Sequence, residues 1–538
     1  MSKTDNFIDL FEEIPSSDLE EQTREIGYYE ELLPIHTFRR DPVDREEICE
    51  CGHDVTVLRD NGTLAYISLP GSLDHYVFHD EVLDLDFGEG LDEEFLSLQI
   101  VGVSDEAIAD TARYFINLTK SKRKICSLRI QFFHPTHIVS FANAGSQCLS
   151  QFFHAAAPNL CVDLRSIKLS AAQSVVLASQ PGVIQLVLDG CYYEDGGVAF
   201  LNAILNRQSS FGSLTFKYYE DLIYDSIDVV PYTALDHTNL ERLLREVDVI
   251  DHVDIPLLET KFAANRSNDN DDGVIADNRN LYANLIFHPF SAKVNSLAYE
   301  LFQSALLKAA WQSVNIVTSK LYLRITSQGT TFPTEAAICL WRRMASLGHF
   351  TELEIAFKCE NIDRGSTVPV CVVQEMICAI RANSSLKVLG LHWDDVNLHR
   401  RSLDWGQHLK TFCEGLRDHK RLLTLKVDVV DKKQTFGSDF SYLRQLLTEF
   451  RFIIVTSCQG QLYSDGKLID KLYTLNRFYC GSTCLQVEPS LERRSLMESA
   501  LMESASNDFQ LSALLMADHV DLLCEVVAQF VELEEFLK

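Results

Sequence analysis

A short apolar element recurs along most of this chain, and this recurrence limits the possible folds more than any other feature of the sequence. Each copy has two aliphatic or aromatic residues separated by one position, often with a third apolar residue three places earlier. Leu186 and Leu188, preceded by Val183, form the clearest copy. Alternating apolar residues are typical of a short strand with one buried face. The chain is therefore expected to repeat one structural unit many times.

The spacing of the copies predicts what this unit contains. The mean interval between successive copies is about 32 residues, and individual intervals run from 19 to 39. The copies begin at Leu98, Leu128, Ile167, Leu186, Leu214, Val247, Leu285, Leu323, Leu353, Leu389, Leu425, Ile453 and Leu485. Helical periodicity lies between them, for example over residues 104–116, 333–345 and 373–380. A strand, a helix and short loops fill a unit of about 30 residues, and such units must stack on one another to bury their apolar faces.

One copy also matches a known motif. The segment from Val183 to Cys191 fits the pattern L-x-x-L-x-L-x-x-N/C, with Val183, Leu186, Leu188 and Cys191 in the fixed positions. Residues 97–488 therefore resemble leucine-rich repeat proteins of the ribonuclease-inhibitor-like class. The resemblance implies an α/β solenoid in the form of a horseshoe, with parallel strands on the concave side and helices outside.

The other clear copies depart from this motif at its end. Only the copy that ends at Cys191 has Asn or Cys there, and in the family this residue satisfies backbone groups of the loop. An ordinary pair of α/β domains, in which strands happen to alternate with helices, is the alternative fold.

Acidic residues are concentrated at the two ends of the chain. Residues 1–96 hold 26 acidic and 6 basic residues, and residues 489–538 hold 10 and 3, so the body between them carries only −2 of the total charge of −29. This predicts an acidic N-terminal segment at 1–96 that is partly ordered or capping, a repeat array at 97–488, and a spacer with an amphipathic helix at 489–538. The negative charge also argues against nucleic acid or an anionic membrane as a partner.

The expected C-terminal helix has an apolar stripe at helical spacings from Leu511 to Leu537, interleaved with acidic residues. A stripe of this length must be buried. We expect the helix to cap the end of the array by packing near residues 453–485. Docking to another chain is the alternative use of the stripe.

The sequence predicts a cytoplasmic protein, with the nucleus as the alternative. The chain does not begin with a signal peptide, and it has no run of about 18 apolar residues that could cross a membrane. Its fifteen cysteines are odd in number, and several lie inside apolar runs, as Cys339 and Cys378 do. This usage is typical of reduced thiols in a core rather than of a disulfide framework.

The sequence contains no catalytic motif and no complete metal or cofactor site. Cys49, Cys51 and His53 are three potential zinc ligands, but structural zinc needs four and no second pair follows. A run from Asn268 resembles a calcium-binding loop, but Arg279 stands where that loop needs a glutamate. Phosphate-binding loops, H-E-x-x-H helices and G-x-S-x-G elbows do not occur. We therefore expect a protein that is not an enzyme and has neither cofactor nor metal.

Polar residues at the outward positions of the expected strands indicate where a partner binds. Their mixed charge suits a protein surface better than a nucleic acid. These candidates are Arg129, Gln131, Lys168, Asp189, Lys217, Arg324, Glu354, Lys358, His392, Lys426 and Asp428. The expected function is a protein–protein interaction scaffold that recognises a protein partner through the repeat surface.

Two other functions remain as alternatives. The first is a substrate-recognition adaptor of a ubiquitin ligase, because Leu33-Pro34 resembles the start of an F-box, although residues 39–47 are too polar to form the helices of that motif. The second is a GTPase-activating leucine-rich repeat protein, because one class of these activators joins such repeats to an acidic tail.

Overall fold

Strands and helices alternate along most of the chain in a computed structural model with a mixed α/β fold, in which most strands pair in parallel. The structure describes residues 3–15, 34–69, 81–88, 94–118, 124–133, 138–217, 234–256, 286–327, 329, 331–359, 368–393, 405, 408–416, 419, 421–429, 432–437, 439–485, 493, 496–497, 499–500 and 509–522. The chain divides into two compact units. Unit 1 is Met1–Leu301 with Asn315–Thr318, and unit 2 is Phe302–Val314 with Ser319–Lys538.

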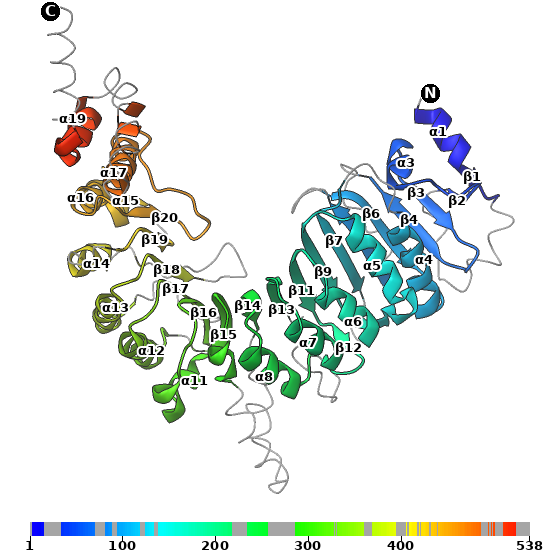
Figure 1. The fold of residues 1–538 in the computed structure, drawn as a ribbon, viewed down its shortest axis with the longest axis horizontal. Helices are drawn as coiled ribbons and strands as arrows, with labels where there is room; N and C mark the ends of the chain where they lie inside the picture. Colours follow the sequence, from blue (N-terminus) through cyan, green and yellow to red (C-terminus); the bar gives the residue numbers. More distant parts are fainter. Residues whose placement is uncertain are drawn as a thin grey trace, which may run out of the picture. The chain divides into compact units, whose positions relative to one another are not determined.

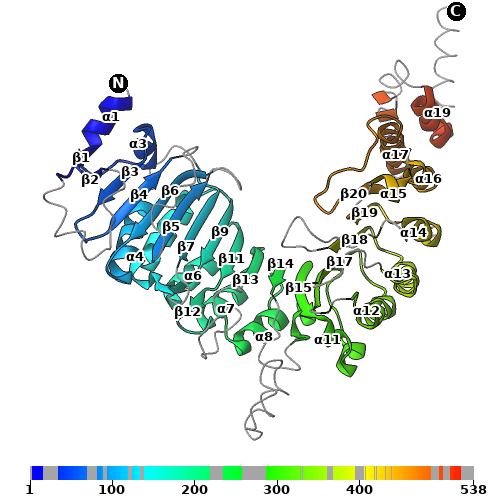
Figure 2. The ribbon, with the colours of Figure 1, turned by 180° about the vertical axis from the view of Figure 1, so that it is seen from behind.

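The central part of unit 1 is a parallel sheet covered by helices on one face. Its strands, each paired in parallel with the next, are β7 (Ser127–Phe133), β9 (Asn159–Arg165), β11 (Val183–Asp189), β13 (Gly212–Lys217), β14 (Ile250–Ile255) and β15 (Ser296–Phe302). Its helices are α4 (Asp105–Asn117), α5 (Ser146–Ala155), α6 (Ala171–Ala178), α7 (Val198–Leu205) and α8 (His237–Glu246). Helices α4 to α7 lie along the same face of the sheet (Figures 1 and 2). We call the opposite face the open face.

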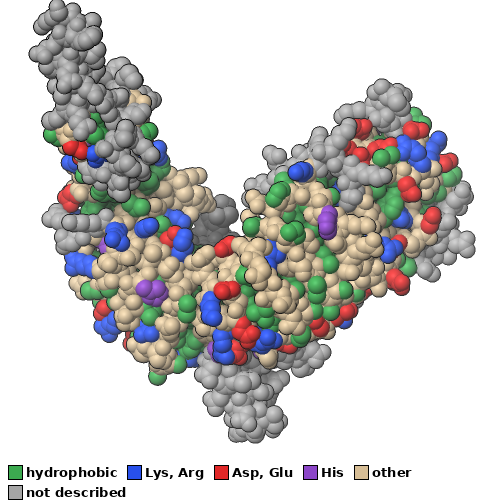
Figure 3. Space-filling model, in the orientation of Figure 1, with side chains coloured by type: hydrophobic (Ala, Val, Ile, Leu, Met, Phe, Trp, Pro, Cys, Tyr) green, Lys and Arg blue, Asp and Glu red, His purple; other side chains and the backbone are tan. Residues whose placement is uncertain are grey.

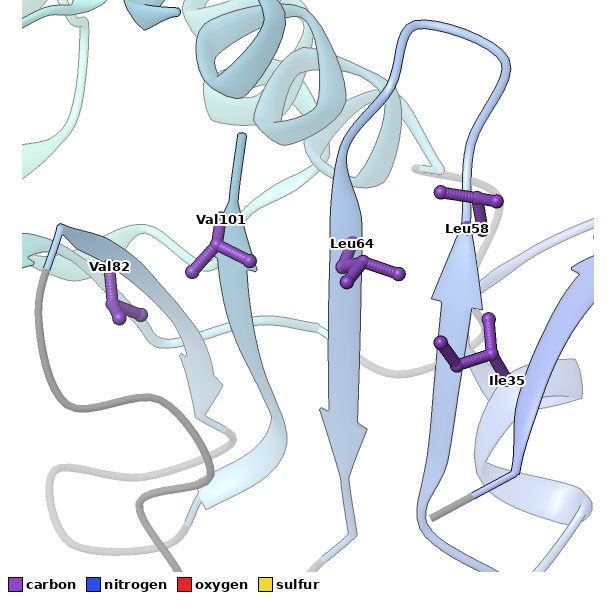
Figure 4. Packing of buried hydrophobic residues seen from close by; sticks show 5 residues of the cluster. All are labelled: Ile35, Leu58, Leu64, Val82 and Val101. Atoms are coloured by element: carbon purple, nitrogen blue, oxygen red, sulfur yellow. The ribbon is translucent and has the colours of Figure 1, made fainter. Parts of the chain in front are cut away.

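The N-terminal strands extend this sheet at the β7 edge. They are β1 (Phe11–Glu13), β2 (Ile35–Phe38), β3 (Val55–Leu58), β4 (Leu64–Ser68), β5 (Val82–Gly88) and β6 (Glu94–Val101), with the short helices α1 (Lys3–Leu10) and α3 (Arg45–Glu50). Strand β5 pairs antiparallel with both β6 and β7. Figure 4 shows Ile35, Leu58, Leu64, Val82 and Val101, which form a buried cluster along strands β2 to β6. The described part of the acidic segment therefore covers the first edge of the parallel sheet.

Unit 2 repeats the same arrangement. Its strands β16 (Lys320–Ser327), β17 (Glu352–Cys359), β18 (Val388–Trp393), β19 (Thr424–Val427) and β20 (Ile454–Thr456) pair in parallel, in this order. Its helices include α11 (Gln303–Leu306), α12 (Thr334–Leu347), α13 (Val370–Ala382), α14 (Leu409–Leu416), α15 (Lys432–Phe436), α16 (Ser441–Glu449) and α17 (Leu468–Leu485). Helices α12, α13 and α14 lie side by side along one face of β16–β19, and the other face is again called the open face (Figures 1 and 2).

Local sequence explains why the strand–helix repeats of unit 2 form. Leu353, Leu389 and Leu425 occupy the same register position in β17, β18 and β19, and all three are buried on the helix side. Gly348 ends α12 in the left-handed conformation, with φ of 65°, so that the chain can turn back toward β17. The stacked leucines thus form one continuous core from strand–helix repeats, none of which could bury its apolar face alone.

The Cys191 side chain contacts a backbone group of strand β9. Its thiol donates to the carbonyl oxygen of Leu164, at the end of the preceding strand, with an Sγ–O distance of 3.0 Å. Burial raises the pKa of this thiol to about 12, so it stays protonated and remains a hydrogen-bond donor.

Many of the predicted strand starts are confirmed. Parallel strands are present at Leu128, Leu186, Leu214, Leu323, Leu353, Leu389 and Leu425, and β20 begins directly after Ile453. In β11, Leu186 and Leu188 are buried while Val187 between them is half-buried on the open face, as in a strand with one buried side. Leu285 lies outside the described residues.

Four other starts are wrong as strands of the parallel array. Leu98 lies in the antiparallel strand β6, and Val247 ends helix α8 just before β14. Leu485 is the last residue of helix α17. Ile167 begins β10 (Ile167–Leu169), which pairs with β8 (Val139–Ser140) and β12 (Tyr192–Tyr193) in a separate small sheet. Ser166, with φ of 52°, turns the chain at the end of β9. The apolar pair in β9 therefore belongs to the large sheet, whereas the pair that begins at Ile167 belongs to the small sheet.

The described part of the C-terminal segment packs against α17, within residues 453–485 where the sequence placed it. Helix α19 (Phe509–Asp518) contributes Leu515 to a buried cluster with Met497 and Leu522, against which Phe478 of α17 packs. The Ser482 hydroxyl donates to Asp518 Oδ2 at 2.8 Å. Residues 523–538 lie outside the described residues. No helix within the described residues is both long and apolar enough to cross a membrane.

Candidate functional site

Charged side chains of opposite sign alternate across the open face of unit 1. Asp86 of β5, Arg129 of β7 and Asp163 of β9 lie opposite one another in the sheet register. Arg129 bridges the two acids, with Nη1 3.4 Å from Asp86 Oδ2 and Nε 3.5 Å from Asp163 Oδ2. Arg165 Nη2 lies 2.6 Å from Asp163 Oδ2. We call these four residues the charged row, in which each acid contacts at least one guanidinium.

Three of the predicted surface residues lie next to the charged row. Gln131 pairs in register with Arg165, and Asp189 pairs with Lys217, which is exposed. Asp189 was expected at the surface but is only 6% exposed. Burial raises the pKa of its carboxyl group, and the nearby positive charges of Arg165 and Lys217 offset this only in part. Asp189 is therefore a buried acid on the open face rather than a surface contact.

Lys168 does not join the other candidates of unit 1. It was placed on the sheet face because Ile167 was taken as an array strand. It instead lies in β10 of the small separate sheet, where its Nζ is 3.9 Å from Glu194 Oε1. The expectation that Lys168 shares a face with Arg129 is wrong.

The open face of unit 2 has a polar cluster centred on Glu354 of β17. His392 Nε2 lies 2.6 Å from Glu354 Oε2, and Lys426 Nζ donates to Glu354 Oε1 at 2.7 Å. Burial alone would raise the pKa of this carboxyl group, but the hydrogen bonds from His392 and Lys426 bring it below its usual value. Because an ionised carboxylate only accepts, Nε2 of His392 must carry the proton that it shares with Glu354.

A glycine makes this cluster sterically possible. Gly390 lies between Glu354 and Lys426 in the register, and a Cβ atom there would stand 2.5 Å from His392 Nε2 and 2.8 Å from Glu354 Cγ. On the other side of the imidazole, the Tyr322 ring packs edge-on at 5.5 Å between ring centroids. His392 is consequently held on several sides and is buried, although the sequence predicted a surface position for it.

Two more polar residues lie beside His392 at the ends of the neighbouring strands. The pairing of Leu391 with Val427 brings His392 beside Asp428, and Cys458 lies in the turn that follows β20, whose last pair with β19 is Lys426 with Thr456. The backbone NH of Cys458 donates to Asp428 Oδ1 at 3.2 Å. One ligand atom each from His392, Asp428 and Cys458 lies within 4.8 Å of the other two. Burial and the adjacent Asp428 raise the pKa of the Cys458 thiol far above its usual value. We call Glu354, His392, Lys426, Asp428 and Cys458 the polar cluster.

The structure brings together four predicted residues in this cluster and adds one, Cys458, that the sequence did not indicate. Arg324 and Lys358 were also predicted, and they lie on the same open face, in β16 and β17. Cys458 was missed because the last strand was started at Ile453, whereas Val455 is the residue that pairs with Leu425. If the strand is counted from Val455, Cys458 stands three residues after the strand start, as His392 and Asp428 do after Leu389 and Leu425.

The cysteine-rich segment near the N-terminus has a different arrangement. Cys51 is buried with its Sγ 3.4 Å from the Glu47 carbonyl oxygen, and burial raises its pKa to about 11. His53 is exposed and packs edge-on against Phe7. Among the described residues, the ligand atoms of a possible metal site approach one another at His392, Asp428 and Cys458, not here.

Comparisons with known proteins do not assign this chain to a family. No protein-family model matches the sequence, and no curated protein matches it either.

Proposed function

We propose that this chain is a degenerate leucine-rich repeat protein of the ribonuclease-inhibitor-like class, a horseshoe-type array that acts as a non-enzymatic scaffold for a protein partner. Three features support the repeat class: stacked parallel strands, helices gathered on one face, and the contact of the Cys191 thiol with Leu164. We also propose that it acts in the cytoplasm, which agrees with the free thiols of the cysteines whose side chains are described.

The charged row is the observation that carries the proposed binding role. A face that grips nucleic acid needs uninterrupted positive charge to neutralise phosphates, whereas here Asp86 and Asp163 flank Arg129. Acidic and basic side chains also lie intermingled over the molecular face drawn in Figure 3. Alternating charges suit a polypeptide, which can offer both carboxylates and ammonium or guanidinium groups to the same face. We therefore propose that the partner is a protein bound to the open face of unit 1.

Of the two alternatives, the ubiquitin-ligase adaptor loses its sequence argument. The residues after Pro34 form strand β2 (Ile35–Phe38), which pairs with β1 and β3, where an F-box would begin a helix. A GTPase activator would need an arginine that reaches the nucleotide of its partner. Arg129 and Arg165 are instead held by Asp163.

Site-specific photocrosslinking in the full chain tests the proposed face. One crosslinker replaces Gln185, exposed on the open face of β11, and a matched one replaces Val175, exposed on α6. In native extract, the partner should crosslink at 185 and not at 175, and Lys217→Glu should weaken the product at 185. A partner captured only at 175, or capture at 185 that Lys217→Glu leaves unchanged, would refute the proposed face. The identity of the captured protein also decides the alternatives, because ligase core subunits or a GTPase would each be recognised.

A further inference from the structure

We propose that His392, Asp428 and Cys458 bind a Zn²⁺ ion at the open face of unit 2. His392 lies near the end of β18, Asp428 directly follows β19, and Cys458 lies in the turn after β20; these three strands are consecutive and parallel. Neighbouring strands are about 4.8 Å apart, so His392 and Asp428 lie close together, and the turn that begins at Ser457 brings Cys458 to Asp428. The site thus combines the register of β18 and β19 with the turn after β20, and its ligands are far apart in the sequence.

The donor atoms suit zinc better than other common ions. An imidazole nitrogen, a carboxylate oxygen and a thiolate sulfur are the ligands that Zn²⁺ takes in proteins, whereas Mg²⁺ and Ca²⁺ need oxygens throughout. Tetrahedral bonds of about 2.0–2.3 Å separate ligand atoms by roughly 3.3–3.8 Å. The three ligand atoms already lie within 4.8 Å of one another, so small side-chain rotations would complete the site. Three protein ligands leave a fourth position for water or for a group of a partner.

Glu354 prepares His392 for this role. Nε2 of His392 lies 2.6 Å from Glu354 Oε2, so Nδ1 is the ring nitrogen that would bind the ion. A carboxylate behind a histidine in this way fixes the tautomer and makes the other nitrogen a better ligand. Lys426 balances the charge of Glu354 at 2.7 Å. The two positive charges of Zn²⁺ would then be matched by the Asp428 carboxylate and the Cys458 thiolate.

Binding requires one balanced step. The Cys458 thiol loses its proton to solvent as the Zn–S bond forms, and Asp428 exchanges its contacts with Cys458 for a bond to the ion. Neither oxidant nor reductant takes part.

Cobalt titration of the full chain, after removal of bound metal with a chelator, tests the site. Co²⁺ takes the place of Zn²⁺, and a thiolate ligand gives a sulfur-to-cobalt charge-transfer band that should saturate at one equivalent. Cys458→Ser and Asp428→Asn should each abolish or strongly weaken this band. The double variant Cys49→Ser/Cys51→Ser is the matched control, because it removes the other clustered thiols, and it should keep the band. A band that survives Cys458→Ser, or disappears in the control, overturns the proposal.

Two further measurements separate metal binding from a loss of folding. Glu354→Gln should keep the ligands and the fold but weaken Zn²⁺ binding by about 10–100-fold, as loss of an orienting carboxylate does. In the unmodified chain, Zn²⁺ should displace the proton of the Cys458 thiol, and the released protons can be counted in weakly buffered solution with a pH indicator. Binding of Zn²⁺ without release of a proton would contradict thiolate ligation at this site.

Discussion

Replacing Leu188 with alanine should open unit 1 locally before the rest of the chain unfolds. Leu188 is 1% exposed and lies in register between Leu164 of β9 and Phe216 of β13, both also buried. The substitution removes three carbon groups from the core, and at about 0.8 kcal/mol each this lowers the free energy of unfolding by about 2.4 kcal/mol. Both neighbours are fixed by strand pairing and cannot collapse into the space, so the cavity should bring the loss to about 4 kcal/mol, within the usual range of roughly 2–5 kcal/mol.

Hydrogen exchange measured by mass spectrometry shows where this loss appears. Because each strand–helix unit contacts mainly its neighbours, we expect faster exchange in β9, β11 and β13 and unchanged exchange in β17–β19. Val187→Ala is the control, since Val187 is half-buried on the open face of the same strand and should cost less. Two results would refute the argument that neighbouring strand–helix repeats share one local core. One is hydrogen exchange that rises equally in unit 1 and unit 2, and the other is a loss of unfolding free energy below about 1 kcal/mol.

Three other predictions concern single residues. The raised pKa of Asp189 means that the folded chain holds a proton on this carboxyl group more tightly than the unfolded chain, so ionisation of Asp189 destabilises the fold as pH rises. Asp189→Asn should therefore raise the melting temperature at pH 7. This gain should fade when the pH falls below 3.8, the usual pKa of the carboxyl group. Cys191, whose pKa is about 12, should resist alkylation in the native chain while Cys371 reacts quickly, as mass spectrometry after a timed pulse would show. Leu515→Glu should release α19 from α17 and cause aggregation on size-exclusion chromatography, whereas Val520→Glu, at an exposed position, should not.

The alternation of strands and helices could be predicted because burial determines it locally. Leu353, Leu389 and Leu425 recur at near-equal spacing since each must fill the same layer beneath its helix. The same pattern failed at Ile167 and Val247, where an apolar residue follows a turn or ends a helix. A spacing of two identifies a buried side but not the sheet to which a strand belongs, because that depends on backbone turns such as the one at Ser166.

The candidate sites were predictable only in part, for a similar reason. Polarity at outward positions singled out Glu354, His392, Lys426 and Asp428, but it could not show that these side chains meet. Their meeting depends on the missing side chain of Gly390, which carries no polarity signal at all. Contacts between strands depend on register, and an error of two residues in one strand displaces a whole row of side chains along the sheet.

The polar cluster also bears on how the end of the array is held together. Strand β20 has only three residues, Ile454–Thr456, so its pairing with β19 provides few backbone hydrogen bonds. An ion bound by His392, Asp428 and Cys458 would connect β18, β19 and β20, and at a free concentration 100 times its dissociation constant it would stabilise the folded state by about 2.7 kcal/mol. In a stacked array this stabilisation is confined to the strand–helix repeats that the ion contacts. Zn²⁺ should therefore slow hydrogen exchange in β18–β20 and leave β9–β13 unchanged, which distinguishes a built site from general binding of metal to surface thiols.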